Sequence, residues 1–347
     1  MRNAKRLSVY LGLSGFIYAV LASMAQAENP SFSPATPKDT DRKFYYSSDN
    51  LTGLEGWTWI HYEINTEGRV VEPLLINHSE KSRFIENAFE LLEDLEFNPA
   101  TLNGSPVESS RLMFLRHARN IGSDQNKSAG ENFAEAYGEV IALIGKNDLD
   151  NAEQAIQTIK DDFKYNLVRQ AWLAWVTAML NFRDKDYDNY LYNLTVAGYL
   201  AEDYLSNKVT SKLYMNLFEM QMYSHRYLDA QDTIEKMINS DKVSIDNELA
   251  DALSTRVEQR LATTEPYSVT LELGEGKWRA LRLNRNKVTL HWEQNVISGL
   301  KLRCEGRNTD YLSSLENAHS PLTIESEFDE CVLLVKGTAG EQVTVQQ

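Results

Sequence analysis

Histidine, cysteine and glycine-rich segments are the parts of this sequence whose side chains could take part in chemistry. The six histidines are scattered and follow no metal-binding spacing such as H-E-x-x-H; they are His61, His78, His117, His225, His291 and His319. A G-x-S-x-G segment, which would present a nucleophilic serine, does not occur either. We therefore expect a protein that is not an enzyme and that uses no metal and no cofactor.

The segment GEGKWRA at 274–280 has two glycines and a lysine, as a phosphate-binding loop would. It lacks the third glycine of a dinucleotide-binding loop, and Trp278 stands where a P-loop has serine or threonine. A hairpin turn is the better interpretation of this segment.

The two cysteines, Cys304 and Cys331, both lie late in the chain. In an exported protein an isolated pair of cysteines is typical of one disulfide. Closing that loop would stabilise the protein by ~3.5 kcal/mol on the chain-entropy model. The alternative is a pair of buried thiols; a catalytic thiol would need a histidine partner, which the sequence does not offer in a recognisable pattern.

The first 27 residues have the three parts of a secretory signal peptide. Basic residues within 2–6 precede an apolar segment at 7–22, and an A-x-A sequence follows at 25–27. We expect cleavage after Ala27 and export to the periplasm, with no membrane span in the mature protein. The alternative is an uncleaved anchor helix, although the apolar segment is short for a span and contains two Gly and two Ser.

The mature chain is strongly acidic. Without the three basic residues of the signal peptide it has 32 Lys and Arg against 50 Asp and Glu, a net charge of −18. Such a surface repels nucleic acid and anionic lipid, so we expect neither as a partner. About 320 mature residues are enough for two or three domains.

Residues 44–118 follow the order strand, strand, helix, strand, after a Pro-containing leader at 28–43. The segments 56–64 and 69–78 predict two strands, and the sequence between them predicts a turn. Apolar residues at helical spacing predict an amphipathic helix whose buried stripe is Phe84, Ala88, Leu91, Leu92 and Leu95. A final strand, which carries Leu112 and Phe114 with Met113 as a further candidate, completes a three-stranded sheet with one helix on its apolar face.

Residues 56–64 alternate between two faces. Thr58, Ile60, Tyr62 and Ile64 would face the helix. Glu63 would lie on the other face together with Trp57, Trp59 and His61. These last three side chains are the candidate binding residues. The alternative is that they pack against the leader or against the helical part of the chain.

The segment FNPATLNGSPV at 97–107 contains the strongest turn signal in the chain. Asn103 and Gly104 both tolerate the positive φ of a two-residue hairpin turn. Pro99 cannot donate a hydrogen bond to a sheet, so it must lie at the end or edge of a strand.

This region resembles the C-terminal domain of TonB, the periplasmic energy-transducing protein. The matching residues include Gly68, Phe97, Pro99, Ala100, Asn103, Gly104, Pro106 and Val107. The resemblance covers about residues 44–118 and implies a β-β-α-β fold in which Gly68, Phe97, Pro99, Asn103 and Gly104 are structural. It also implies partners among TonB-dependent outer-membrane receptors or components of the TonB system, bound by adding a strand to a sheet edge.

The sequence also departs from that family. In TonB the domain ends the chain, after an anchor with a functional histidine and a long Pro-rich span. Here the domain comes first, the apolar segment lacks histidine, and the leader has only three Pro. The fold can therefore carry over without the energy transduction.

Residues 129–264 predict helical repeats. The segments 146–159, 184–197 and 225–238 share a pattern aligned on Ala152, Tyr190 and Ala230, with an apolar residue three positions earlier and another four later. A period of 38 to 40 residues is typical of helix–turn–helix solenoids and resembles tetratricopeptide repeats. The aromatic-rich run at 172–182 could line a peptide groove, although ordinary helix packing is the favoured interpretation.

Residues 266–347 alternate again, in seven short segments separated by Gly, Asn or Pro, which predicts a small β-sandwich. The whole chain is thus expected to be a multidomain protein: an α+β module, an all-α repeat and an all-β sandwich. We expect a non-catalytic protein-binding role, as an accessory of TonB-dependent transport across the Gram-negative envelope. The alternatives are a periplasmic scaffold for envelope protein assembly and an enzyme with an unrecognised site.

Overall fold

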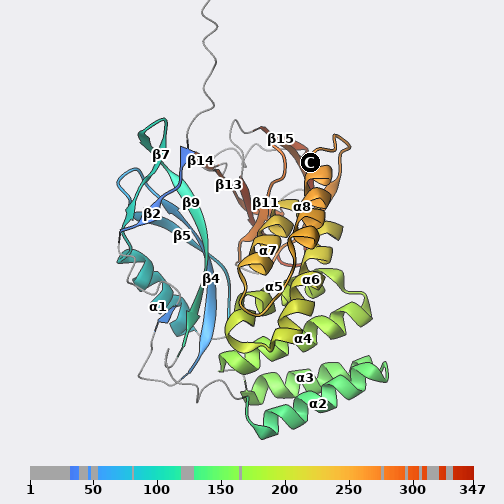
Figure 1. Ribbon diagram of the computed structural model, residues 1–347. Helices are drawn as coiled ribbons and strands as arrows, with labels where there is room; N and C mark the ends of the chain where they lie inside the picture. The colour runs from blue at the N-terminus through green and yellow to red at the C-terminus, as the bar shows by residue number, and fades with distance from the viewer. Residues whose placement is uncertain are drawn as a thin grey trace, which may run out of the picture.

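The computed structural model describes residues 32–38, 46–47, 54–79, 82–118, 129–163, 166–274, 277–293, 296–304, 307–310, 320–325 and 331–347. The expected signal peptide and its cleavage site lie outside these residues. A strand-rich N-terminal part is followed by a helical block and then by two C-terminal sheets (Figure 1). No helix in the described part of the chain combines the length and the apolar character needed to cross a membrane.

The N-terminal sheet has the strand order β3-β9-β4-β5. Its strands are β3 (Tyr46–Ser47), β4 (Gly56–Ile64), β5 (Val70–His78) and β9 (Ser109–His117). Strand β4 is antiparallel to both β5 and β9, and β3 runs parallel to β9. The predicted three strands are therefore present, and the short β3 adds a fourth that the sequence did not predict.

Both faces of this sheet are covered (Figure 1). On one face Ile60, Tyr62 and Ile64 pack in one core cluster with Ala88 and Leu92 of α1 (Ser82–Glu93), as the alternation predicts. On the opposite face the aromatic side chains join the core of the helical block. The sheet therefore lies between α1 on one face and the helical block on the other.

The apolar residues of β9 that face α1 differ in part from the ones that the sequence predicted. Met113 and Leu115 belong to the α1 cluster, whereas Phe114 packs on the helical block and Leu112 is 43% exposed. Of the three apolar residues predicted for this strand, only Met113 lies on the helix-covered face, so the prediction is wrong for Leu112 and Phe114. Four consecutive apolar residues, Leu112 to Leu115, hide the alternation that would have identified the face.

The predicted Asn-Gly turn is confirmed. It joins β7 (Ala100–Leu102) to β8 (Ser105–Val107), and φ is 52° at Asn103 and 79° at Gly104. Leu102 pairs with Ser105, which makes a two-residue hairpin loop. Pro99 lies between β6 (Phe97–Asn98) and β7, where it interrupts no strand.

The described part of the leader docks on this hairpin. Its two short strands are β1 (Phe32–Ser33), which pairs with β7, and β2 (Thr36–Pro37), which pairs with β6. Ala35, between them, is buried. These pairings make residues 32–38 part of the N-terminal unit, which the Pro-containing sequence did not predict.

The helical block consists of α2 (Glu131–Gly145), α3 (Leu149–Phe163), α4 (Leu167–Asp184), α5 (Tyr187–Tyr204), α6 (Asn207–Tyr223), α7 (Tyr227–Asn239) and α8 (Asn247–Leu261). The repeated sequence pattern corresponds to one structural position. Its first apolar residues, Leu149, Tyr187 and Tyr227, begin α3, α5 and α7. Two residues before each of them the backbone has a positive φ, at Asn147, Lys185 and His225. The same turn therefore joins the helices in three successive pairs.

The C-terminal part has two four-stranded antiparallel sheets, ordered β10-β17-β12-β15 and β11-β16-β13-β14. The strands are β10 (Ser268–Glu272), β11 (Arg279–Arg282), β12 (Lys287–His291), β13 (Ile297–Cys304), β14 (Arg307–Asp310), β15 (Leu322–Glu325), β16 (Val332–Gly337) and β17 (Gln342–Gln346). Buried residues of both sheets form one core cluster. Seven of these strands match the predicted segments, and β14 was not predicted.

The predicted disulfide is present. Cys304 at the end of β13 and Cys331 just before β16 are joined, with an S–S distance of 2.04 Å, and both are buried.

Candidate functional site

The three candidate binding residues lie on a face of β4 that is not open to solvent. Trp57 is only 5% exposed, and its ring stacks on that of Phe114 with 5.2 Å between centroids. Trp59 meets Tyr199 of α5 edge-to-face at 5.5 Å, and Tyr199 in turn stacks on Phe114 at 4.5 Å. Packing against the helical block, the alternative considered above, is therefore what the structure shows for both tryptophans.

His61 contacts the C-terminal part of the chain instead. Its side chain is almost fully buried, and its Nδ1 accepts a hydrogen bond of 2.8 Å from Nη1 of Arg303. Burial, together with the nearby charge of Arg303, lowers the pKa of His61 to about 3. The imidazole is therefore neutral at physiological pH and acts as an acceptor.

Arg303 is the centre of a buried ionic cluster between β13 and the N-terminal sheet. Its side chain has no exposed surface, and its Nε lies 2.6 Å from Oε1 of Glu63. Its Nη2 donates to the backbone oxygen of Glu72 at 3.0 Å and lies 3.4 Å from Oε2 of the same residue. Lys301 forms a further ion pair with Glu72. Burial raises the pKa of Glu63, and the charge of Arg303 opposes that shift.

Trp59 and His61 also line a cavity of about 1380 Å³ where the three parts of the chain meet. The N-terminal sheet, helices α5 to α7 and strands β10 and β11 all contribute to its walls. Trp57 is not among the lining residues. Two of the three predicted residues thus border a cavity that lies between the parts of the chain and is open to solvent.

The walls of this cavity are rich in charged side chains. Among the described residues its cations are Arg111, Arg226, Lys236, Lys277, Arg279 and Arg282, and its anions are Asp186, Asp188, Asp229, Asp232 and Glu272. Six positive groups against five negative ones make the lining slightly basic. The chain as a whole carries a net charge of −15, so the cavity has the opposite sign to the protein.

The two aspartates of α7 that line the cavity are paired with arginines. Arg282 of β11 lies 2.7 Å from Asp232, and Arg226, just before α7, lies 3.6 Å from Asp229. The ammonium group of Lys236 lies over the ring of Tyr199, 4.7 Å from its centroid. Desolvation lowers the pKa of Lys236 and raises that of Asp229, because protein surrounds both groups even where the cavity reaches them.

Asn77 of β5 joins all three parts of the chain at one amide. Its Nδ2 donates to the hydroxyl oxygen of Tyr192 in α5 at 2.9 Å. Its Oδ1 accepts from Nζ of Lys277, next to β11, at 3.3 Å. Burial raises the pKa of Tyr192 to about 12, so its hydroxyl keeps a proton that can be donated elsewhere.

The helical block carries a second concave site, a groove of about 680 Å³. Its lining comes mainly from α2, α4 and α6, the first helices of the three successive pairs, and from the start of α5. Three large aromatic side chains of this lining are exposed: Phe182 by 53%, Tyr187 by 38% and Tyr223 by 67%. Trp175, at its floor, is buried. The aromatic-rich run thus contributes to packing and to an exposed groove.

The charged residues around this groove are mainly basic. Arg183 and Lys212 line it, with the ammonium of Lys212 5.9 Å from the ring centroid of Trp175. The lining carboxylate, Glu219, is held by Arg256 through two hydrogen bonds of 2.7 and 2.8 Å. The accessible charge of the groove is therefore positive.

Of the predicted structural residues, Gly68 lies against Phe97 and Pro99, whereas Asn103 and Gly104 form the turn between β7 and β8. Gly68 has a φ of 81°, and a Cβ added to it would lie 1.9 Å from the backbone oxygen of Phe97. The backbone nitrogen of Phe97 donates to the oxygen of Gly68 at 2.8 Å. A glycine is therefore required at position 68, because the chain approaches too closely for any side chain.

The sequence did not indicate that Asn77 contacts Tyr192 and Lys277. It did not indicate either that Arg303 contacts the N-terminal sheet. In β13, Leu300, Leu302 and Cys304 alternate with Lys301 and Arg303, a pattern typical of a strand whose charged face is exposed. That face is buried against the N-terminal sheet instead. In the described part of the chain, no group of three or more His, Cys, Asp or Glu side chains is arranged to hold a metal ion.

Comparison with known proteins adds no relative to this picture. A scan against models of protein families finds no match for the chain, and a search of curated proteins finds none either.

Proposed function

We propose that this protein is an exported, non-catalytic scaffold that binds a segment of a partner protein in the groove between α2, α4 and α6. The observation that carries this proposal is the exposure of Phe182, Tyr187 and Tyr223 around an apolar hollow. Exposed aromatic residues that surround a groove are typical of protein interaction sites. The repeating helix pairs, which resemble tetratricopeptide repeats, support the same role.

The chemistry of the groove defines the class of partner. Tyr187 and Tyr223 lie edge-to-face with 5.6 Å between their ring centroids. The ring centroids of Phe182 and Tyr190 are 5.2 Å apart. These rings suit an apolar or aromatic side chain of the bound segment. Arg183 and Lys212 suit an acidic residue beside it, because a groove of positive charge attracts the opposite sign. The partner is therefore a peptide segment with an apolar anchor and an adjacent carboxylate.

Export to the periplasm belongs to the same proposal. The three-part sequence of residues 1–27 supports it. The disulfide between Cys304 and Cys331 supports it too, because disulfides persist in oxidising compartments.

A second candidate role is the one implied by the TonB resemblance, in which a partner adds a strand to the N-terminal sheet. The observation in its favour is that, among the described residues, β5 is hydrogen-bonded to a strand on one side only. Pro73 and Glu72 on this strand are exposed. A receptor segment bound along this outer edge would make the protein an accessory of TonB-dependent transport.

Photo-crosslinking in the native host tests both roles in one experiment. A photoreactive amino acid replaces Tyr223 in the groove, Pro73 on β5, or the exposed Glu153 of α3 as the control position. The scaffold proposal predicts a discrete adduct at position 223 that disappears when Phe182 is also replaced by alanine. Adducts with outer-membrane receptors at position 73 alone would favour strand addition instead. Equal adducts at positions 223 and 153 would refute the groove.

A further inference from the structure

The wall of the central cavity formed by Tyr192, Lys277 and Arg279 presents hydrogen-bond donors from two parts of the chain. Lys277 uses one N–H on the amide oxygen of Asn77. Arg279 uses its Nε–H on the backbone oxygen of Glu272 at 2.7 Å. Tyr192 accepts from Asn77 and therefore keeps its own O–H to donate. The remaining N–H and O–H groups are hydrogen-bond donors, and two of the three side chains carry the positive charge that an anion requires.

Other cations of the cavity differ from Lys277 and Arg279 in how their charges are balanced. Arg226 is paired with Asp229 of α7, and Arg282, at the other end of β11 from Arg279, is paired with Asp232 of α7. No carboxylate of a described residue lies within ion-pair distance of Lys277 or Arg279. The positive charge of Arg279 is nevertheless felt locally, since it partly offsets the rise in the pKa of Tyr192. Two cations of the cavity that have no carboxylate of a described residue within ion-pair distance, Lys277 and Arg279, thus lie two positions apart in the sequence.

The acidic residues of the cavity lining limit the negative charge that a bound anion can carry. Five acidic residues share the cavity with six basic ones, so the described lining balances about one negative charge. A planar carboxylate matches the fork of a guanidinium and carries that single charge. A dianionic phosphate would meet the same donors but more repulsion from the acidic walls. Trp59, Leu191 and Leu271 add apolar surface beside the donors.

We propose that Tyr192, Lys277 and Arg279 bind the carboxylate of a monoanionic ligand whose apolar body occupies the central cavity beside Trp59. This site is separate from the groove of the helical block and from the edge of β5. It lies where the N-terminal sheet, α5 and β11 meet, so a bound ligand contacts all three parts of the chain. A ligand that binds only the assembled junction stabilises that assembly.

The test uses the purified full-length chain and a matched pair of probes, acetyl-leucyl-phenylalanine and the same dipeptide with a C-terminal amide. Isothermal titration calorimetry gives the affinity of each probe, and inorganic phosphate is the third probe. We expect the acid to bind at least tenfold more tightly than the amide and than phosphate. Raising the ionic strength should weaken the binding of the acid, because charges that solvent reaches are screened.

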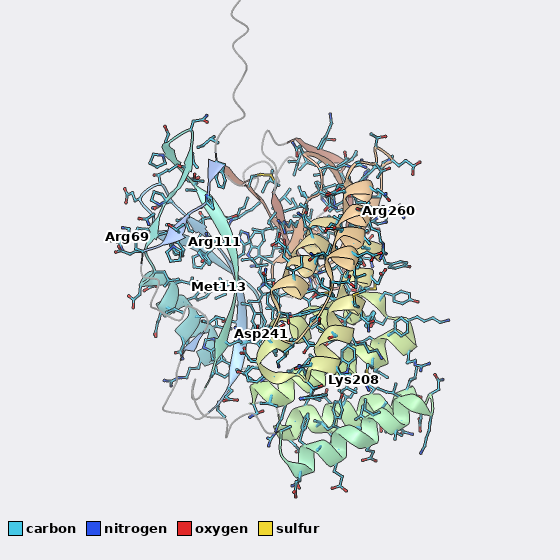
Figure 2. All side chains as sticks on the ribbon, viewed as in Figure 1. Arg69, Arg111, Met113, Lys208, Asp241 and Arg260 are labelled. Carbon is cyan, nitrogen blue, oxygen red and sulfur yellow. A yellow bond between two sulfur atoms is a disulfide. The ribbon has the colours of Figure 1, made fainter. Side chains whose placement is uncertain are left out.

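Variants then locate the site. Arg279→Gln should weaken binding of the acid at least tenfold, and Lys277→Gln should weaken it severalfold. Lys208→Gln removes the same charge from α6, away from the cavity lining, and should leave the affinity within twofold (Figure 2). Circular dichroism and thermal unfolding identify any variant that fails to fold, and Lys277→Gln, at a half-buried position before β11, serves if Arg279→Gln is one of these.

Three results would overturn the proposal. The first is the absence of saturable binding of the acid at millimolar concentration. The second is equal binding of the acid and the amide, which would show that the carboxylate is not recognised. The third is phosphate binding as tight as that of the acid, which would replace the carboxylate class by a general anion site.

Discussion

The guanidinium group of Arg303 and the carboxylate of Glu63 form a buried ion pair, with 2.6 Å between Nε and Oε1. The two residues belong to β13 and β4, so this pair joins the C-terminal sheets to the N-terminal sheet. His61 and Glu72 supply the remaining partners of the guanidinium. The positions of the N-terminal and C-terminal parts therefore depend on a guanidinium group that water does not reach and on a carboxylate that is largely shielded from water.

Replacing Arg303 by methionine should destabilise the protein by about 3–5 kcal/mol, because Glu63 is then left buried without its partner. Urea denaturation followed by circular dichroism measures the change. The matched control is Arg256→Met, which breaks an exposed pair with Glu219 and should cost no more than about 1 kcal/mol. The double change Arg303→Met with Glu63→Leu should be more stable than Arg303→Met alone. Similar costs for Arg303→Met and Arg256→Met would contradict this account of the ion pair.

The neutral state of His61 should make stability depend on pH. The folded protein holds the pKa of this residue at about 3, whereas the ordinary value is 6.5. Between these values the unfolded chain binds a proton that the folded protein does not, so stability falls as the pH drops from about 6.5 towards 3. The contribution is about 1.4 kcal/mol per pH unit.

His61→Gln isolates this contribution, because glutamine can still accept from Arg303 but does not titrate. The variant should lose less stability than the parent between pH 6.5 and pH 4. Glu63 acts in the opposite direction, since its raised pKa makes the folded state bind a proton more readily. It is present in both proteins, so the difference between their pH profiles reports His61. Parallel profiles would show that His61 titrates normally in the folded protein.

Gly68→Ala should destabilise the N-terminal sheet by at least about 2 kcal/mol. The alanine would have to adopt a positive φ, and its Cβ would collide with the backbone oxygen of Phe97. Gly104→Ala is the matched control, because Gly104 has nearly the same φ but has no atom within 4 Å of an added Cβ. That change should cost only the conformational strain, about 1–2 kcal/mol. Equal losses in thermal unfolding would mean that the contact with Phe97 contributes nothing.

Removing the disulfide should lower stability by about 3.5 kcal/mol, because the reduced chain regains the entropy of the loop between Cys304 and Cys331. Denaturation with and without dithiothreitol measures the loss. The double variant Cys304→Ser with Cys331→Ser should be as unstable as the reduced parent protein, both with and without the reductant. A parent protein that is equally stable when reduced would rule out a stabilising role for this bond.

Local features of the fold were predictable because their signals are local. Alternation in 56–64 predicted which residues of β4 face α1, since successive side chains of a strand point to opposite faces. The Asn103-Gly104 turn followed from two residues that tolerate a positive φ. The pattern aligned on Ala152, Tyr190 and Ala230 predicted repeated helix–turn–helix units, and each copy of it lies at the start of α3, α5 or α7.

The candidate site was only partly predictable. The sequence placed Trp57, Trp59 and His61 on one face of β4 but contained no signal for what covers that face. The run from Leu112 to Leu115 concealed the orientation of β9, because apolar residues on both faces of a strand leave no alternation. Lys301 and Arg303 resembled exposed residues of a sheet, and the structure buries them.

By itself, the sequence determined α1, the extent and the repetition of the helical part, most of the strands and the hairpin turn, and it favoured the disulfide over two buried thiols. The tertiary structure alone decided which surfaces meet: His61 with Arg303, Asn77 with Tyr192 and Lys277, and both faces of one sheet with different partners. The physical reason is that only local preferences leave a recognisable pattern in the amino-acid sequence. A turn depends on a few adjacent residues, and burial repeats every few residues along a strand or helix, so both can be recognised in the sequence. A contact between residues far apart in sequence needs only one complementary group on each side and therefore leaves no such pattern.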